Sequence, residues 1–184
     1  MASSKAAIAA DIPDFDPPLV VPTMDLEALF RRYASYVATI AYRILGSRDE
    51  LEDVVQDVFL NAHKTVASLR NADAVKGWLA TVTVRVCHQR LQARKLRRLL
   101  RLELPPATFD PPDPAASPET KAALNDIFRV LEAVPTDARI AWSLRYLEGE
   151  RLERVAELTG CSLAAVKRRL AKAQAALNEV IDDE

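Results

Sequence analysis

DELEDVVQDVFLNAHK, residues 49–64, is the stretch from which the fold of this chain can be worked out. Read as an α-helix that turns about 100° per residue, it gathers its apolar residues on one side at the spacing i, i+3, i+4, i+7. These residues are Leu51, Val54, Val55, Val58, Phe59 and Ala62. The opposite side carries charged and amide side chains with one leucine among them, namely Asp53, Gln56, Asp57, Leu60 and Lys64. The pattern predicts a helix with one face in a core and the other outside it.

Leu60 is unusual because an ordinary amphipathic helix would place a charged residue or an amide at its position. An apolar residue surrounded by carboxylates and an amide is typical of a docking site for a basic, partly apolar partner. The alternative is a solvated face with one stray leucine, since isolated exposed apolar residues are common. The pattern alone leaves both interpretations open.

The run from Glu52 to Leu60, EDVVQDVFL, resembles the core-binding helix of bacterial extracytoplasmic-function (ECF) sigma factors, whose usual form is close to E-D-L-V-Q-E-x-F-L. The resemblance implies that this helix docks on the clamp coiled coil of the largest subunit of core RNA polymerase. The residues that would make the contact are Glu52, Asp53, Gln56, Asp57 and Leu60. The resemblance also implies promoter DNA as a partner and an anti-sigma factor as an inhibitor.

The composition is that of a globular protein, which we expect to be cytoplasmic. The 184 residues are 49% hydrophobic and 28% charged, as in ordinary soluble domains. No apolar run approaches the ~20 residues that span a bilayer, so we expect no membrane association. Cys87 and Cys161 lack metal-ligand or CxxC spacing, so we expect reduced thiols, no metal site and no cofactor.

The net charge of −1 hides an uneven distribution along the chain. Residues 25–102 carry 14 basic and 8 acidic side chains, whereas residues 103–120 carry four acids and no base. A local basic patch, more than the total charge, sets the field that phosphates meet. A nucleic-acid partner is therefore compatible with this slightly acidic chain.

The first half of the chain divides into a tail, a helical domain and a linker. Residues 1–24 are rich in alanine, aspartate and proline without periodicity, which predicts a disordered tail. Residues 25–102 predict a three-helix bundle, and its first helix has an apolar stripe that includes Leu29, Phe30 and Tyr33. The expected helices are Asp25–Leu45, residues 48–66 and Ala74–Leu102. Residues 103–117 are rich in proline and acids, which predicts a linker.

Residues 118–184 predict a second domain of four helices. Ser117 followed by Pro118 is typical of a helix N-cap and its first residue. The other expected helices are Thr136–Glu148, Glu150–Thr159 and Ser162–Val180, with Thr136 and Ser162 as N-caps and Gly149 and Gly160 between them. A short helix, a glycine-containing turn and a capped helix form the helix-turn-helix pattern. The predicted fold class is all-α, with two small helical domains joined by a proline-rich acidic linker.

The last predicted helix combines small and basic residues on its outer face. Its inner stripe contains Leu163, Val166 and Leu170, and the small residues of its first turn would let the backbone approach the floor of a DNA groove. A solvated helix face is the alternative. The segment Leu152–Arg169 resembles the promoter-recognition helix-turn-helix of ECF sigma factors. This resemblance implies contact with the minus-thirty-five element through Ser162, Ala164, Ala165, Lys167, Arg168, Arg169 and Lys172.

The end of the third predicted helix, RLQARKLRRLLR at residues 90–101, holds six basic residues and no acid. Closely spaced like charges repel one another, and no acid at i+4 relieves them within the helix. A polyanion would stabilise them, and its binding would depend strongly on salt concentration. The alternative is again a solvated helix face.

In ECF sigma factors, the third helix and the loop before it read and melt the minus-ten element. The resemblance assigns this role to Arg70, Asn71, Arg85, His88, Gln89, Arg94, Lys95 and Arg98. Arg70 and Asn71 would lie in a loop that captures a flipped base. The family commonly has Asn where Arg85 stands and Asp where Gln89 stands, so we expect different contacts at these two positions.

No pattern in the sequence predicts catalysis. His63 and His88 lie on different predicted helices, and the chain has no P-loop and no GxGxxG motif. We therefore expect an alternative sigma factor that directs promoter-specific initiation and is not an enzyme. Two other hypotheses stay open: a helix-turn-helix repressor or activator that does not associate with polymerase core, and an adaptor that uses only the acidic face of the second helix.

Overall fold

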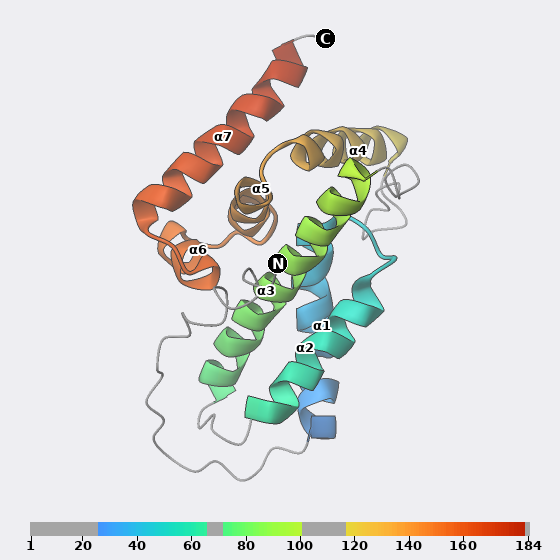
Figure 1. The fold of residues 1–184 in the computed structure, drawn as a ribbon, viewed down its shortest axis with the longest axis vertical. Coiled ribbons are helices and arrows are strands. Elements are labelled where there is room, and N and C mark those ends of the chain that lie inside the picture. The colour runs from blue at the N-terminus through green and yellow to red at the C-terminus, as the bar shows by residue number, and fades with distance from the viewer. Residues whose placement is uncertain (1–25, 66–71, 101–116, 183–184) are drawn as a thin grey trace, which may run out of the picture.

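The computed structural model describes residues 26–65, 72–100 and 117–182, and every regular element within these ranges is helical (Figure 1). This confirms the all-α prediction for the described part of the chain. The expected tail, residues 1–24, and almost all of the expected linker lie outside the described residues. Arg70 and Asn71 also lie outside them.

Three helices, α1 (Leu26–Leu45), α2 (Leu51–Thr65) and α3 (Ala72–Leu99), pack on one another as the first bundle. The side of α2 predicted to face a core does so, since Val54 and Val58 are fully buried. α2 begins three residues later than expected because the chain first makes a turn, in which the Asp49 N–H donates to Ser47 Oγ at 3.2 Å.

The end of α1 is a glycine cap. Gly46 has a φ of +67°, and its N–H donates to the Tyr42 carbonyl at 2.8 Å. The absence of a side chain at Gly46 also leaves room for a ring from the second half of the chain. A Cβ built there would lie 2.3 Å from Cδ1 of Phe128, a buried ring in the second half of the chain. Gly46 therefore both ends α1 and admits a close neighbour.

The second half contains α4 (Pro118–Ala133), α5 (Thr136–Trp142), the π-helical segment η2 (Ser143–Leu147), α6 (Leu152–Thr159) and α7 (Leu163–Asp182). α7 packs against α4, α5 and α6, and these helices form the second domain (Figure 1). The N-caps predicted at Ser117 and Ser162 are confirmed, because each side-chain oxygen accepts a backbone N–H three residues on, at 3.2 Å.

The helix expected over Thr136–Glu148 differs from the prediction at both ends. Pro135 holds the N-cap position, and its carbonyl accepts the N–H groups of Ala138 and Arg139, so the predicted cap at Thr136 is wrong. Thr136 is itself the first helical residue and is buried. The last turn widens into η2, where the Glu148 N–H donates to the Ser143 carbonyl.

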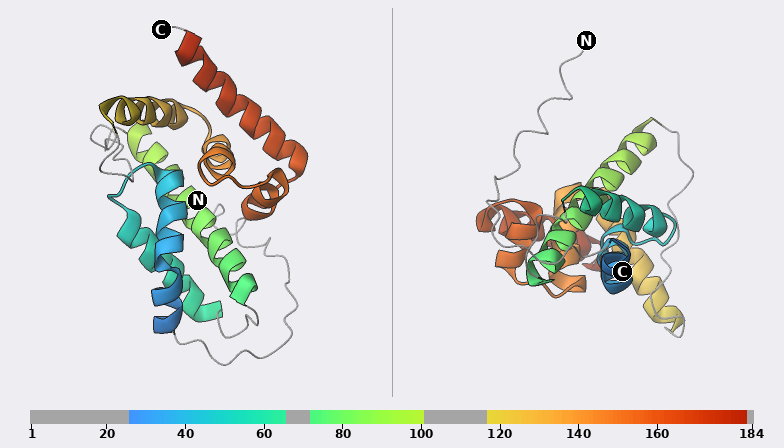
Figure 2. Two further views of the ribbon diagram at one scale, coloured as in Figure 1. Left: turned by 180° about the vertical axis from the view of Figure 1, so that it is seen from behind. Right: turned by 90° about the horizontal axis from the view of Figure 1, so that it is seen from below.

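The two domains are packed against each other. α5 and α6 lie on α3, as Figures 1 and 2 show from three directions. The segment η2 also lies on α1. The buried apolar side chains of both bundles belong to one continuous cluster. Arg154 of α6 lies close to Gly77 of α3, with its Nη2 3.1 Å from where a Cβ would be. The described helices thus form one closed unit.

Replacing Gly46 with alanine should destabilise the fold more than the same change at Gly149. Both glycines have a positive φ, and forcing alanine into that conformation costs roughly 1–2 kcal/mol. Only at Gly46 would the new Cβ also overlap Phe128, which adds about 1–3 kcal/mol of overpacking. Chemical denaturation of Gly46→Ala and Gly149→Ala measures both effects. Equal losses of unfolding free energy would contradict the close contact at Gly46.

Candidate functional site

The outer face of α2 is exposed, as predicted. Glu52, Asp53 and Gln56 are exposed, and Leu60 keeps 56% of its surface accessible although the neighbouring Phe59 is buried. Leu60 therefore lies outside the protein's own core. An apolar side chain bordered by exposed carboxylates and an amide remains available to a partner.

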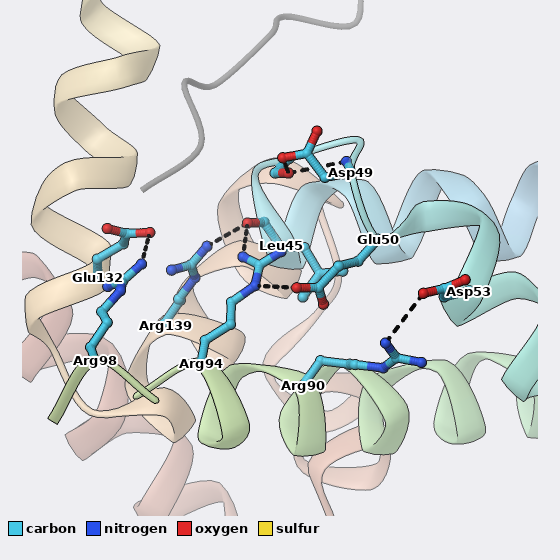
Figure 3. A network of polar contacts seen from close by, with 10 residues as sticks. Leu45, Asp49, Glu50, Asp53, Arg90, Arg94, Arg98, Glu132 and Arg139 are labelled. Atoms are coloured by element: carbon cyan, nitrogen blue, oxygen red, sulfur yellow. Dashed lines mark hydrogen bonds and ion pairs between the residues drawn. The ribbon is translucent and has the colours of Figure 1, made fainter. Parts of the chain in front are cut away.

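Part of the acidic charge on this face is already paired within the chain. Arg90 of α3 forms an ion pair with Asp57. Its guanidinium also lies 3.6 Å from the Asp53 carboxylate (Figure 3). The hydrogen bond to Asp57 raises the pKa of the Arg90 guanidinium above its ordinary value. Asp57 is consequently half-buried, whereas Glu52 and Gln56 are exposed to solvent.

Phe30 of α1 is an exposed apolar residue that the sequence pattern misplaced. Its ring meets that of Phe59 edge to face at 5.0 Å, yet 44% of its surface is accessible. The prediction put Phe30 in the apolar stripe of α1, but the adjacent Leu29 occupies the core. Two consecutive residues point about 100° apart on a helix, so Leu29 faces the core and Phe30 lies at the edge of the buried face.

The minus-ten candidates on α3 fall into two groups. Arg85, Gln89 and Lys95 are exposed. Arg94 and Arg98 instead turn toward acids on other elements (Figure 3). The Arg94 side chain, 13% exposed, donates to Glu50 at 2.9 Å and to the Leu45 carbonyl at 3.3 Å. Arg98 donates to Glu132 of α4 at 2.7 Å.

These pairs correct the interpretation that a polyanion is needed to relieve the repulsion along α3. As expected, α3 has no acid four residues from these arginines. The acids that pair with Arg94 and Arg98 come instead from other segments of the chain. Glu50 precedes α2 and Glu132 belongs to α4, so only the folded chain brings them to Arg94 and Arg98. Sequence periodicity within one helix carries no information about such pairs.

His88 of α3 and Arg169 of α7 share one carboxylate, that of Asp137 on α5. His88 Nε2 lies 3.1 Å from Asp137 Oδ1, and Arg169 Nη2 donates to Asp137 Oδ2 at 3.0 Å. Arg169 also donates to Cys161 Sγ at 3.0 Å. One candidate from each predicted DNA-binding helix is thus held by the same acid. No sequence pattern signals this arrangement, because the three residues are far apart along the chain.

The outer face of α7 is otherwise open. The candidates Ser162, Ala164, Lys167, Arg168 and Lys172 are exposed, and Ala165 is half-buried. Val166 and Leu170 are buried, as predicted, whereas Leu163 is at the margin with 36% of its surface accessible. Gly160, in the left-handed conformation, makes the turn between α6 and α7. The predicted helix-turn-helix geometry is therefore present, with most of its basic residues facing solvent.

Arg139 is the residue at the centre of this region that sequence reasoning missed. It is 4% exposed, and its Nε and Nη2 donate to the carbonyls of Ile44 and Leu45 at 3.1 and 2.7 Å. Its guanidinium also lies over the Phe128 ring, 5.7 Å from the centroid. Burial lowers the pKa of Arg139 to about 10, so it remains a cation at neutral pH.

The described residues contain no cluster of three histidine, cysteine, aspartate or glutamate side chains that could hold a metal ion. Among the same residues, no helix combines the length and apolar character needed to cross a membrane. The described surfaces are instead an acidic face with an exposed leucine and helices lined with basic residues.

Comparison with known families matches both halves of the chain. Residues 29–97 match the family described as Sigma-70 region 2, and residues 124–177 match Sigma-70, region 4. The chain belongs to the ECF sigma factors. The region 2 match contains α2 and most of α3, and the region 4 match contains the helix-turn-helix. Proteins of this kind are non-enzymatic regulators that direct promoter-specific transcription by RNA polymerase.

Relatives in sequence agree with this assignment, and solved structures share the fold. The chain is 32% identical over 154 residues to the probable RNA polymerase sigma factor RfaY of Xanthomonas campestris, covering 79% of this chain but 38% of that protein. It is 28% identical over 166 residues to the ECF sigma-E factor of Escherichia coli K12, covering 82% and 83% of the two chains. The fold matches RpoE of Bartonella quintana, solved with the anti-sigma factor NepR, with a TM-score of 0.63 and 23% identity over 86% and 98% of the two chains.

A second solved structure has the same fold. CnrH, in complex with the cytosolic domain of CnrY, matches with a TM-score of 0.56 and 21% identity, covering 86% of this chain and 88% of that one. Both likenesses concern the whole helical arrangement, because both span nearly the full described range. The all-α, two-domain fold predicted from the sequence is thereby confirmed.

The two cysteines should react differently with a thiol reagent. Cys87 is buried, and burial raises the pKa of its thiol to about 12, so almost no thiolate exists at pH 7. Cys161 is partly exposed in the turn before α7. Mass spectrometry of native protein treated with N-ethylmaleimide should show one adduct, on Cys161, and two only after denaturation. A rapid second adduct on native protein would contradict the burial of Cys87.

Proposed function

We propose that this sigma factor joins core RNA polymerase through the outer face of α2, using Glu52, Asp53, Gln56, Asp57 and Leu60. The observation that carries this proposal is the 56% exposure of Leu60 within a segment matched to Sigma-70 region 2. A clamp surface with basic groups around an apolar pocket would complement it. Residues 25–102 and 118–184 would act as two functional domains joined by the intervening segment.

The second domain would read the upstream promoter element with α7. Its exposed Lys167, Arg168 and Lys172 can pair with phosphates, and Arg168 can present a bidentate guanidinium to a guanine edge. The small side chain of the exposed Ala164 would let the helix backbone approach the groove. These features fit insertion of the N-terminal half of α7 into the major groove.

The first domain would contact and help to open the minus-ten element along α3. Arg85, Gln89 and Lys95 are exposed there, and the first two replace residues common in the family. An arginine in place of an amide adds a positive charge at a base- or phosphate-contacting position, so the preferred minus-ten sequence would differ from that of typical relatives. No catalytic step is required for this role.

An inhibitory partner is part of the proposal. Two proteins of the same fold were solved as complexes, the sigma factor RpoE with the anti-sigma factor NepR and CnrH with the cytosolic domain of CnrY. We infer that a comparable anti-sigma factor controls this chain in the cytoplasm, where it would meet polymerase and DNA. Affinity purification of the tagged chain from its native cell would identify both polymerase subunits and such an inhibitor.

Reconstituted transcription tests the function as a whole. Core RNA polymerase supplemented with the purified chain should initiate at specific positions on promoters drawn from the same genome, and core alone should not. A folded chain that neither binds core nor supports initiation on any candidate promoter would rule out the proposal.

Substituting Leu60 with aspartate should weaken binding to core polymerase by roughly 30-fold, about 2 kcal/mol, because it buries another charge at the contact. Leu96→Asp is the matched control, since Leu96 has the same 56% exposure but lies on α3. Surface plasmon resonance on immobilised core gives both affinities, and circular dichroism checks the helix content. Equal affinities for the two variants would show that Leu60 is incidental.

Substituting Arg168 with alanine should lower transcription from promoters with a minus-thirty-five element by about tenfold, the typical effect of losing one bidentate base contact. Arg129→Ala on α4 serves as control, because Arg129 is exposed and forms an ion pair with Asp126 one turn earlier on the same helix. Run-off transcription with the same core compares them. If both variants lost activity alike, the specific role of Arg168 would be untenable.

A further inference from the structure

We propose that a cavity enclosed by α3, α4 and α5 is a binding site for a small phosphate-bearing anion, either inorganic phosphate or the terminal phosphate of a phosphate monoester. This inference goes beyond the proposed function, since it concerns neither polymerase nor promoter DNA. Such a site would let the concentration of a small ligand act on the stability of the chain.

The cavity lies where α3 of the first domain meets α4 and α5 of the second. Leucine and valine side chains form part of its wall, and its polar lining consists of Arg94, Lys95, Arg98, Glu132, Thr136 and Arg139. Water-sized atoms can occupy about 30 Å³ inside it. One water needs only ~10–15 Å³, so the space fits a group of a few oxygen atoms and is too small for a sugar or a base.

The lining carries an excess of positive charge. Four of its six polar side chains are cations, and the one carboxylate among them is that of Glu132. Glu50, which does not line the cavity, offsets one further charge through its ion pair with Arg94. Because a cleft lined mainly by one sign of charge concentrates its field, the remaining excess favours a divalent anion inside.

Arg139 is the cation that would gain most from such an anion. Its Nε and Nη2 donate to backbone carbonyls of α1, which satisfy hydrogen bonds but bring no negative charge. In Figure 3 its guanidinium lies between those of Arg94 and Arg98. Burial lowers the pKa of Arg139 to about 10; the Glu132 carboxylate opposes this shift, and the charges of Arg94 and Arg98 add to it. A bound anion would stabilise this cation against both burial and repulsion.

The depth of the lining selects a terminal phosphate over the backbone of a nucleic acid. Arg139 is 4% exposed, and the side chains of Arg94 and Glu132 are 13% and 18% exposed. A phosphodiester has a sugar on both sides and one negative charge, so its oxygens cannot enter so small a space. A terminal phosphate enters end-on, where the planar forks of the arginines and the hydroxyl of Thr136 can donate to its oxygens.

Isothermal titration calorimetry of the full chain, with ionic strength held constant by sodium chloride, tests the site. Inorganic phosphate should bind saturably with a Kd of about 1 mM or lower. Glycerol 3-phosphate is the monoester probe, and the tighter binder of the two identifies the source of the phosphate. A dinucleotide without a terminal phosphate is the diester probe and should bind at least about tenfold more weakly than the monoester, because of its lower charge. Phosphate at roughly 20 times its Kd should also raise the Tm by about 5 °C.

Two variants of the lining should shift the phosphate affinity in opposite directions. Glu132→Gln removes the carboxylate of the lining and should tighten binding about tenfold. Its control is Glu153→Gln, the same change at an exposed position of α6, which should gain no more than about twofold. Lys95→Met should weaken binding about threefold, as expected for a partly solvated charge. Its control is Lys76→Met, because Lys76 is also exposed on α3 but roughly five turns away.

Each outcome decides the proposal. Saturable phosphate binding that Glu132→Gln strengthens and Lys95→Met weakens, both beyond their controls, supports the site. The absence of saturable binding up to about 10 mM phosphate overturns it, as does a folded variant that shifts the affinity no more than its control. A dinucleotide that binds as tightly as the monoester overturns the assignment to a small anion and points to DNA. If circular dichroism shows that Glu132→Gln does not fold, Lys95→Met against its control still decides. No measurement uses polymerase or promoter DNA, so failure of the proposed function would appear separately.

Discussion

The buried guanidinium of Arg139 is the interaction on which the closed structure depends. A fully buried cation is unfavourable unless its donors are paired, and here two of its nitrogens donate to the carbonyls that end α1. Those carbonyls in turn need a donor because the helix supplies none. Gly46 turns the chain away immediately afterwards and leaves room for Phe128, whose ring covers the guanidinium. The guanidinium and the helix-end carbonyls thus satisfy each other's hydrogen bonds, and the glycine makes room for the ring that covers them.

The same arrangement explains how a chain with a net charge of −1 can carry a strongly basic helix. Arg90, Arg94 and Arg98 follow one another along α3 at intervals of four residues, and each meets an acid from a different segment (Figure 3). Their mutual repulsion is thereby reduced without acids on α3 itself.

Local patterns predicted the elements well because the forces behind them are local. The 3.6-residue period of α2 located its buried face at Val54 and Val58 and its outer face at Leu60, and the structure confirms both. Ser117 and Ser162 were recognisable as caps from their position before a periodic segment. Thr136 looked equally suitable, but the preceding Pro135 took the cap position. Competition between adjacent candidates is where this kind of prediction fails.

The sequence by itself determined the helical class, the approximate helix boundaries, the outward position of Leu60 and the family resemblance carried by residues 52–60 and 152–169. Only the tertiary structure decided which charges are paired, because the acids that meet Arg94, Arg98 and Arg169 come from other segments of the chain, namely Glu50, Glu132 and Asp137. It also decided that Arg139 is buried and that Phe30 is exposed. Helix period and capping depend on residues a few positions apart, whereas an ion pair or a burial site depends on how separate helices pack, which spacing along one helix does not encode.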